Sequence, residues 1–84
     1  MTYSLYILRC ADGTYYTGIT TDVTRRIDEH NGRSGSGAKY TASRRPVTLV
    51  YEDDFPSRSA ALKEELRVKK LTRAQKQDLI SGLT

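Results

Sequence analysis

The chain of 84 residues contains one cysteine and one histidine. A single cysteine, Cys10, cannot form a disulfide within the chain. Cysteine and histidine are also too scarce here to supply the ligands of a structural zinc cluster. The sequence therefore excludes a disulfide-stabilised fold and a zinc-cluster protein, and Cys10 is interpreted as a small strand residue.

Long hydrophobic runs are also missing. The N-terminal residues Met1–Ser4 carry no basic side chain, and the apolar run that follows is interrupted by Arg9. A signal peptide needs a basic segment before its apolar core, and a membrane helix needs about 20 apolar residues. We therefore expect neither and predict a cytoplasmic protein. A chain this short predicts one domain, residues 1–84, with a modest core.

Acidic residues are absent from the segment Gly32–Arg45, which is rich in glycine and serine. Its basic and aromatic residues are Arg33, Lys39, Tyr40, Arg44 and Arg45. The formal net charge of +4 and the pI near 9.4 favour a polyanionic partner. The segment therefore predicts a mobile basic loop that contacts nucleic-acid phosphates and stacks its tyrosine on a base. A solvated connector without a ligand is the alternative.

Two segments that favour strands carry the most informative tyrosines. Tyr3–Cys10 alternates between two faces, and Thr14–Ile19 is rich in residues that suit strands. Ala11-Asp12-Gly13 lies between them. We predict a three-residue turn with Gly13 in the left-handed conformation, which only glycine adopts without strain.

This turn sets the register of the two strands. It pairs Leu8 with Tyr16 and Tyr6 with Gly18, so both tyrosines lie on one face and Gly18 leaves a hollow opposite Tyr6. A two-residue turn would shift the pairing by one residue and separate the two phenols. The alternative interpretation is that both tyrosines are ordinary sheet residues.

A helix carrying Arg26 and His30 follows. Thr21 or Asp22 can cap it, and it runs to about Asn31 with glycine as its stop. The apolar side chains of this helix place both residues beside its buried stripe, at the boundary between core and solvent. A guanidinium there can reach a ligand while its stem packs on apolar neighbours. A surface arginine and a partly buried histidine without a ligand are the alternative.

Val47–Tyr51 predicts a third strand, which completes a small antiparallel sheet before the acidic patch Glu52–Asp54. A helix then begins at Ser57 or Ser59 and continues to about Leu71. Thr72 and Gln75 form a capping box for a last short helix that ends near Gly82.

Glu65 lies close to the middle of an apolar arc on the longer helix. The arc is formed by Ala61, Leu62, Leu66 and Val68. A carboxylate on a buried face is costly unless a metal ion, an arginine or hydroxyl donors compensate it. An ion pair with Lys69, one turn further on, is the alternative, and the sequence leaves both open.

The order and spacing of these residues resemble the GIY-YIG endonuclease superfamily. The matching residues are Tyr6, Tyr16, Gly18, Arg26, His30 and Glu65. The chain is similar over nearly its whole length to the small stand-alone bacterial members of this superfamily. The similar stretches include Thr17–Asp22, Ala38–Thr41 and Arg45-Pro46. In the first of the two tripeptides that give the family its name, this chain has Ser4 and Leu5 in place of glycine and isoleucine.

The resemblance implies an α/β fold in which helices flank a three-stranded antiparallel sheet. It also implies an enzyme that hydrolyses phosphodiester bonds with one divalent metal ion. Glu65 is then expected to hold Mg²⁺ or Mn²⁺, and Arg26 to donate to the transition state. Tyr6 would orient or deprotonate the attacking water, with Tyr16 and His30 arranging it. A free phenol has a pKa near 10, so Tyr6 can be a base only if the cations lower that pKa substantially.

The function expected from these features is a metal-dependent DNA endonuclease of low sequence specificity, active in repair or recombination. RNA is a less expected substrate, and a protein partner could supply specificity. The alternative is a catalytically weak nucleic-acid-binding module, or a subunit of a larger nuclease complex.

Overall fold

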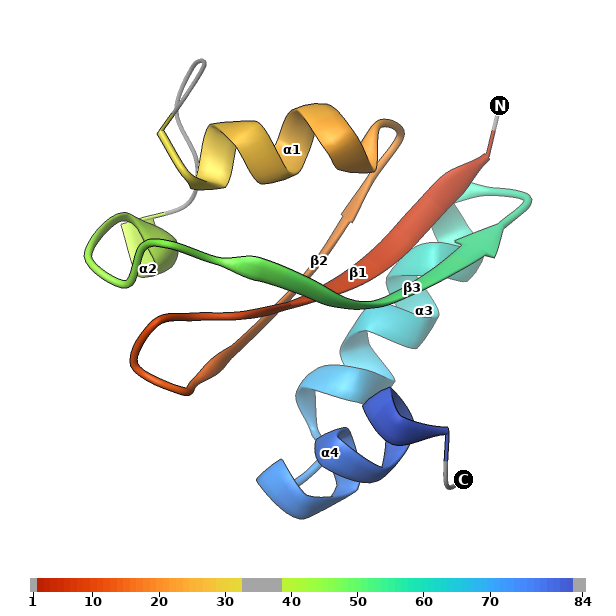
Figure 1. Cartoon of the computed structure of the whole chain (residues 1–84). Coiled ribbons are helices and arrows are strands. Elements are labelled where there is room, and N and C mark those ends of the chain that lie inside the picture. Colours follow the sequence, from red (N-terminus) through yellow and green to blue (C-terminus); the bar gives the residue numbers. More distant parts are fainter. Residues whose placement is uncertain (1, 33–38, 83–84) are drawn as a thin grey trace.

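A computed structural model of the chain describes residues 2–32 and 39–82 (Figure 1). In chain order its elements are β1 (Tyr3–Arg9), β2 (Tyr15–Thr20), α1 (Val23–His30), α2 (Lys39–Ala42), β3 (Thr48–Phe55), α3 (Arg58–Lys69) and α4 (Arg73–Ser81). None of the helices in this part of the chain is long and apolar enough to cross a membrane.

The three strands form one antiparallel sheet in the order β2-β1-β3. The helix α1 covers one face of the sheet, and α3 and α4 lie on the other (Figure 1). The middle strand, β1, is apolar on both faces, which suits a strand with helices on either side. The predicted α/β fold, with its three-stranded antiparallel sheet flanked by helices, is confirmed.

The sheet separates two hydrophobic cores. Toward α1, Tyr6 and Leu8 pack with Cys10 and Val47. Toward α3 and α4, Leu5 and Ile7 of the same strand pack against Val68 and a ring of partly buried apolar side chains. Because side chains alternate along a strand, the even-numbered residues of β1 face α1 and the odd-numbered ones face α3.

The predicted turn between β1 and β2 is confirmed. Gly13 has a φ of +84°, and the N–H of Cys10 donates to the carbonyl of Thr14 at 2.8 Å. The ladder pairs Leu8 with Tyr16 and Tyr6 with Gly18. The two tyrosines therefore share the face of the sheet toward α1.

The predicted helix caps are also present. Asp22, Ser57 and Thr72 each accept a hydrogen bond from a backbone N–H in the first turn of α1, α3 and α4. The capping box of Thr72 with Gln75 forms, and Gly82 ends α4 in the left-handed conformation. Local chemistry therefore decides where these helices begin.

Three predictions about the second half of the chain were wrong in part. β3 does not end at Tyr51 but continues through the acidic patch to Phe55, because its pairing with β1 continues and the Ser4 hydroxyl donates to Asp54 at 2.6 Å. Residues 39–42 of the expected loop form the helical turn α2. Leu66 is 59% exposed rather than part of a buried arc, because α3 rests on the sheet through Ala61 and Val68.

Candidate functional site

Tyr6 and Gly18 face each other across the β1/β2 ladder at close range. A Cβ atom placed on Gly18 would lie 2.6 Å from the Tyr6 hydroxyl oxygen and 2.7 Å from the ring carbon that carries it. Real carbon atoms do not approach so closely. The phenol ring of Tyr6 therefore fills the hollow that was predicted at Gly18.

Three aromatic side chains meet above this point, and we call Tyr6, Tyr16 and His30 the tyrosine–histidine cluster. The ring centroids are 6.4 Å apart between the two tyrosines, 5.8 Å between Tyr6 and His30, and 4.9 Å between Tyr16 and His30. A hydrogen bond of 2.9 Å joins the Tyr6 hydroxyl and Nε2 of His30. The structure thus brings together three of the predicted site residues, from β1, β2 and α1.

His30 does not lie at the boundary between core and solvent, as its helical position had indicated. It is 0% exposed. The turn α2 covers it, and a hydrogen bond of 2.8 Å joins Nδ1 of His30 to the hydroxyl of Thr41, which is also fully buried. Arg45 adds a bond from its Nε to the His30 carbonyl, at 2.7 Å. Thr41 and Arg45 therefore contact His30 from outside α1, and the helical pattern of α1 alone cannot reveal these contacts.

Arg26 does lie at the predicted boundary. Its side chain is 28% exposed, and Nη1 donates to the carboxylate of Glu29 at 2.9 Å. The guanidinium also hydrogen-bonds the Tyr6 hydroxyl, which lowers the pKa of that phenol. Arg26 therefore connects the buried cluster with solvent, and Glu29 is a partner that the sequence did not indicate.

The pKa of Tyr6 moves in the direction opposite to that expected for a catalytic base. Burial raises it from 10.0 to about 12, the Arg26 guanidinium opposes that rise only in part, and Tyr16 and the Glu65 carboxylate add to it. A phenol with such a pKa keeps its proton at neutral pH. The nearby cation does not make Tyr6 a phenolate.

His30 is held in its neutral form. Burial is the main cause that lowers its pKa from 6.5 to about 4, and the positive charge of Arg26 lowers it further. Glu29 opposes this shift, while Arg45 reinforces it. At pH 7 the imidazole is therefore neutral and can accept a proton at one nitrogen.

The low pKa of His30 predicts a stability that depends on pH. Because the folded pKa is below the unfolded value, the stabilising contribution is complete above pH 6.5 and is lost as pH falls toward 4. We expect the free energy of unfolding to fall by about 2 kcal/mol between pH 7 and pH 5. Urea titrations at several pH values measure this change.

Since the chain has one histidine, a His30→Gln variant provides the control. It should lose most of the dependence on pH in this range, whatever its own stability, because ordinary carboxylates titrate mainly below pH 5. A wild-type stability that is equal at pH 7 and pH 5 would contradict a neutral buried imidazole.

Glu65 lies on α3, which packs on the other face of the sheet. Its side chain is 15% exposed, and Nζ of Lys69 lies 3.5 Å from its carboxylate, so the predicted alternative ion pair is present. The carboxylate is near enough to raise the pKa of Tyr6. Glu65 is thus mostly buried, paired and electrostatically coupled to the cluster.

A divalent ion was expected at Glu65. Within residues 2–32 and 39–82, no three His, Cys, Asp or Glu side chains lie close enough together to form a metal cage. Mg²⁺, however, commonly keeps several waters and uses one or two carboxylates together with substrate phosphates. A single, largely buried carboxylate that is electrostatically coupled to Tyr6 fits that kind of binding, in which Lys69 would have to give up its contact.

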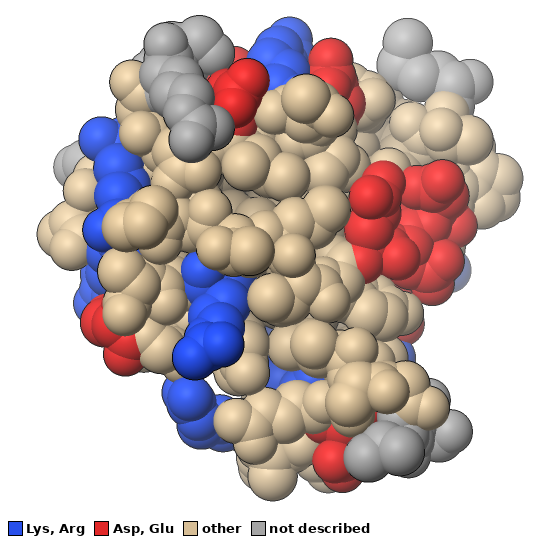
Figure 2. Space-filling view, in the orientation of Figure 1, with Lys and Arg blue, Asp and Glu red and all other residues tan. Residues whose placement is uncertain are grey.

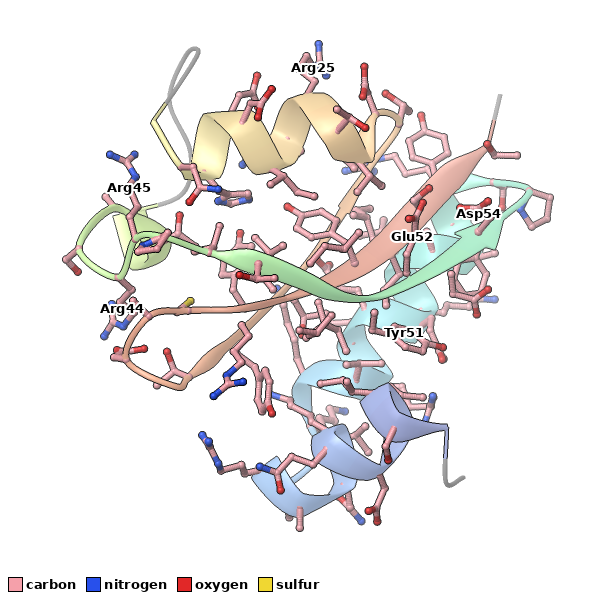
Figure 3. The ribbon with its side chains drawn as sticks, viewed as in Figure 1. Arg25, Arg44, Arg45, Tyr51, Glu52 and Asp54 are labelled. Atoms are coloured by element: carbon pink, nitrogen blue, oxygen red, sulfur yellow. The ribbon has the colours of Figure 1, made fainter. Side chains whose placement is uncertain are left out.

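Of the predicted phosphate-binding residues, Arg45 contacts the cluster through the His30 carbonyl. Arg44 forms an ion pair with Asp12 at 3.0 Å, and with Arg45 it stands next to α2 (Figure 3). Arg33 lies outside the described residues, as do the side chains of Lys39 and Tyr40, whose backbone belongs to α2.

On the face seen in Figure 2, the largest groups of basic and of acidic side chains lie apart. Basic side chains gather on the side of α2 and the β1/β2 turn, and acidic ones gather over the end of β3 (Figure 2). Glu52 and Asp54, on β3, lie far from Arg44 and Arg45 (Figure 3). A polyanion would therefore approach from the basic side.

Thr41 was missed as a site residue. The only signal in the sequence was its place in the stretch Ala38–Thr41, which resembles the superfamily without indicating a role for the threonine. Its contact with His30 joins residues 11 positions apart in different elements. No helical or strand periodicity could have paired them.

Comparisons with known proteins agree with this geometry. The model of the GIY-YIG catalytic domain matches residues 2–78. A UPF0213 protein of Halobacterium salinarum is 56% identical over 75 residues, which cover 89% of this chain and 95% of that protein. A UPF0213 protein of Desulfotalea psychrophila is 54% identical over 78 residues, which cover 93% of this chain and 70% of that protein.

Two solution NMR structures resemble the fold. The UPF0213 protein of Bacillus halodurans has a TM-score of 0.62 and 49% identity, with 96% of this chain and 84% of that chain covered. A protein of E. faecalis has a TM-score of 0.67 and 45% identity, with 99% and 86% covered. With the family model matching nearly the whole chain, the protein belongs to the GIY-YIG family, among the UPF0213 proteins.

Proposed function

We propose that the protein is a metal-dependent endonuclease that hydrolyses DNA phosphodiester bonds with low sequence specificity, in repair or recombination. The observation that carries the proposal is the tyrosine–histidine cluster with Arg26 at its rim. A neutral imidazole bonded to a phenol, beside a guanidinium that reaches solvent, combines a proton acceptor with a donor for phosphate oxygens. Membership of the GIY-YIG family supports the same activity.

The proton chemistry follows from the two shifted pKa values. Tyr6 cannot hold a negative charge at neutral pH, so it acts together with His30. The attacking water gives a proton to the Tyr6 oxygen while the Tyr6 proton moves to Nε2 of His30. The resulting hydroxide bonds to phosphorus, the bond to the leaving oxygen breaks, and that oxygen takes a proton from solvent. Arg26 donates to the non-bridging oxygens as negative charge develops on them.

Glu65 is the residue that would hold Mg²⁺ or Mn²⁺, with water completing the shell. A bound ion would supply charge neutralisation at the scissile phosphate. Burial of the carboxylate at 15% exposure keeps it in place for that purpose.

The surface around the site favours backbone contacts over base reading. Arg33, Lys39, Arg44 and Arg45 would contact the phosphates, which position a nucleic acid without reading its sequence, and Tyr40 would stack on a base. A single domain of this size has little surface for a long recognition site, so specificity would have to come from outside this domain, for example from a protein partner. DNA is the preferred substrate and RNA the less favoured one. A cytoplasmic location stays a prediction.

A plasmid nicking assay tests the proposal. The wild type should nick supercoiled DNA with Mg²⁺ or Mn²⁺ but not with EDTA. Glu65→Gln should need a higher Mg²⁺ concentration for half-maximal nicking, because an amide binds the ion less strongly than a carboxylate. Arg26→Ala should lower the rate at saturating Mg²⁺.

Matched controls come from neighbouring residues. Glu64→Gln removes a carboxylate that is paired with Arg67 at 2.6 Å, and Arg25→Ala removes a guanidinium that is 61% exposed on α1. Both controls should nick like the wild type. If Glu65→Gln and Arg26→Ala also behave like the wild type, the activity does not come from this site.

One observation favours a second function, that of a catalytically weak nucleic-acid-binding module. Tyr6 is 1% exposed, and burial raises its pKa to about 12, so its hydroxyl is neither open to bulk water nor ready to ionise. This module would bind DNA with an affinity that falls steeply with salt, without nicking it under any metal condition. The same plasmid assay, combined with binding at two salt concentrations, separates the two functions.

A further inference from the structure

A chain of three buried side chains runs from Tyr6 through His30 to Thr41. Tyr6 is 1% exposed, and His30 and Thr41 are 0% exposed. The hydroxyl of Tyr6 lies 2.9 Å from Nε2 of His30, and the hydroxyl of Thr41 lies 2.8 Å from Nδ1. Thr41 belongs to α2, so the last member of the chain comes from a different part of the sequence than the cluster.

The direction of the first hydrogen bond can be derived from Tyr6. Its hydroxyl proton needs an acceptor within the protein, because the residue is almost completely shielded from water. Arg26 cannot serve, since a guanidinium only donates. Among residues 2–32 and 39–82, the acceptor within hydrogen-bond distance of this hydroxyl is Nε2 of His30. Tyr6 therefore donates to His30.

The second hydrogen bond follows from the first. A neutral imidazole carries one N–H and one acceptor nitrogen. When Nε2 accepts from Tyr6, the proton of the ring is on Nδ1, and Nδ1–H donates to the hydroxyl oxygen of Thr41. In the opposite tautomer, Nε2–H would point at the Tyr6 oxygen, and no proton could pass from Tyr6 to the ring.

We infer that Thr41 is a positioning residue, which keeps His30 protonated at Nδ1 and so leaves Nε2 free to accept the proton of Tyr6. Thr41 acts through its hydrogen bond with His30. Its catalytic importance rests on the proposed nuclease function, whereas the tautomer is a property of the free protein and can be measured without any activity.

The tautomer is measured by NMR on ¹⁵N-labelled protein at pH 7. With one histidine in the chain, correlations between the ring nitrogens and the carbon-bound ring protons report on His30 alone. We expect Nδ1 to be protonated and Nε2 unprotonated in the wild type and in Thr41→Ser. Thr41→Val, which cannot accept a hydrogen bond, should shift the ring toward Nε2–H. A wild-type ring protonated at Nε2 would overturn the inference.

Nicking assays on the same variants test the catalytic consequence. Thr41→Val should lower the rate roughly 100-fold, which lies in the range of a lost general base, while Thr41→Ser should stay within about threefold of the wild type. The control is Thr48→Val, an exposed threonine on β3, which should change neither the tautomer nor the rate.

The outcomes separate the two proposals. A shifted tautomer in Thr41→Val without a loss of nicking overturns the positioning role, and so does an unchanged tautomer in a folded Thr41→Val. If Thr41→Val does not fold, the wild-type spectrum still tests the tautomer of His30, and the nicking rate of Thr41→Ser still tests whether a hydroxyl at this position supports the activity. If the wild type shows Nδ1–H but never nicks DNA, the tautomer stands and the nuclease function is wrong.

Discussion

Tyr6→Phe is expected to lower the nicking rate about 1,000-fold, a loss within the range for general acid–base groups. The substitution removes one oxygen atom and leaves the ring in its place over Gly18. It takes away both the group that receives the water's proton and the group that delivers a proton to Nε2 of His30, 2.9 Å away. Single-turnover nicking at saturating metal measures the loss.

The same substitution should lower the free energy of unfolding by about 1 to 3 kcal/mol, because Nε2 of His30 loses its hydrogen bond with Tyr6. A protein that stays folded at 25 °C allows the rate to be compared. Tyr51→Phe is the matched control, because Tyr51 packs on the opposite side of the sheet, toward α3 and α4. A Tyr6→Phe protein that nicks at the wild-type rate would exclude the phenol from the proton path.

Gly18→Ala should both destabilise the protein and abolish most of its activity. The new methyl carbon would lie 2.6 Å from the Tyr6 hydroxyl oxygen, so the ring must move although it is buried. Overpacking of this kind costs typically about 1 to 3 kcal/mol. The displaced hydroxyl would lose its contact with His30, and the nicking rate should fall at least as far as in Tyr6→Phe.

A double-mutant cycle isolates this contact. In a Tyr6→Leu background the clashing ring is absent, so adding Gly18→Ala should cost much less than it does in the wild type. Urea unfolding of the four proteins gives the coupling energy. Equal costs of Gly18→Ala in both backgrounds would mean that the phenol ring does not occupy the space over Gly18.

The parts of the fold that depend on neighbouring residues in the chain could be predicted from the sequence. Gly13 determines the turn, and the turn determines that Tyr6 pairs with Gly18. Asp22 and Ser57 mark the beginnings of α1 and α3 by accepting backbone hydrogen bonds in their first turns. These signals are local, because a cap or a turn is decided within about four residues.

The parts that depend on packing between distant segments could not be predicted. The burial of His30 comes from α2, and the helical pattern of α1 contains no information about that cover. The length of β3 is decided by its partner strand, although Asp53 and Asp54 are poor strand formers. The sequence allowed a base at Tyr6 only if cations lowered the pKa of its phenol, but burial outweighs Arg26 and raises that pKa.

The acidic end of β3 has a consequence for how copies of the protein behave toward one another. β3 is an edge strand, and Glu52, Asp53 and Asp54 are exposed along it. An open edge invites pairing with the edge of another molecule, and like charges on both partners oppose it. The three carboxylates therefore oppose edge-to-edge aggregation of this small sheet. Substitutions that neutralise them should promote aggregation at high protein concentration.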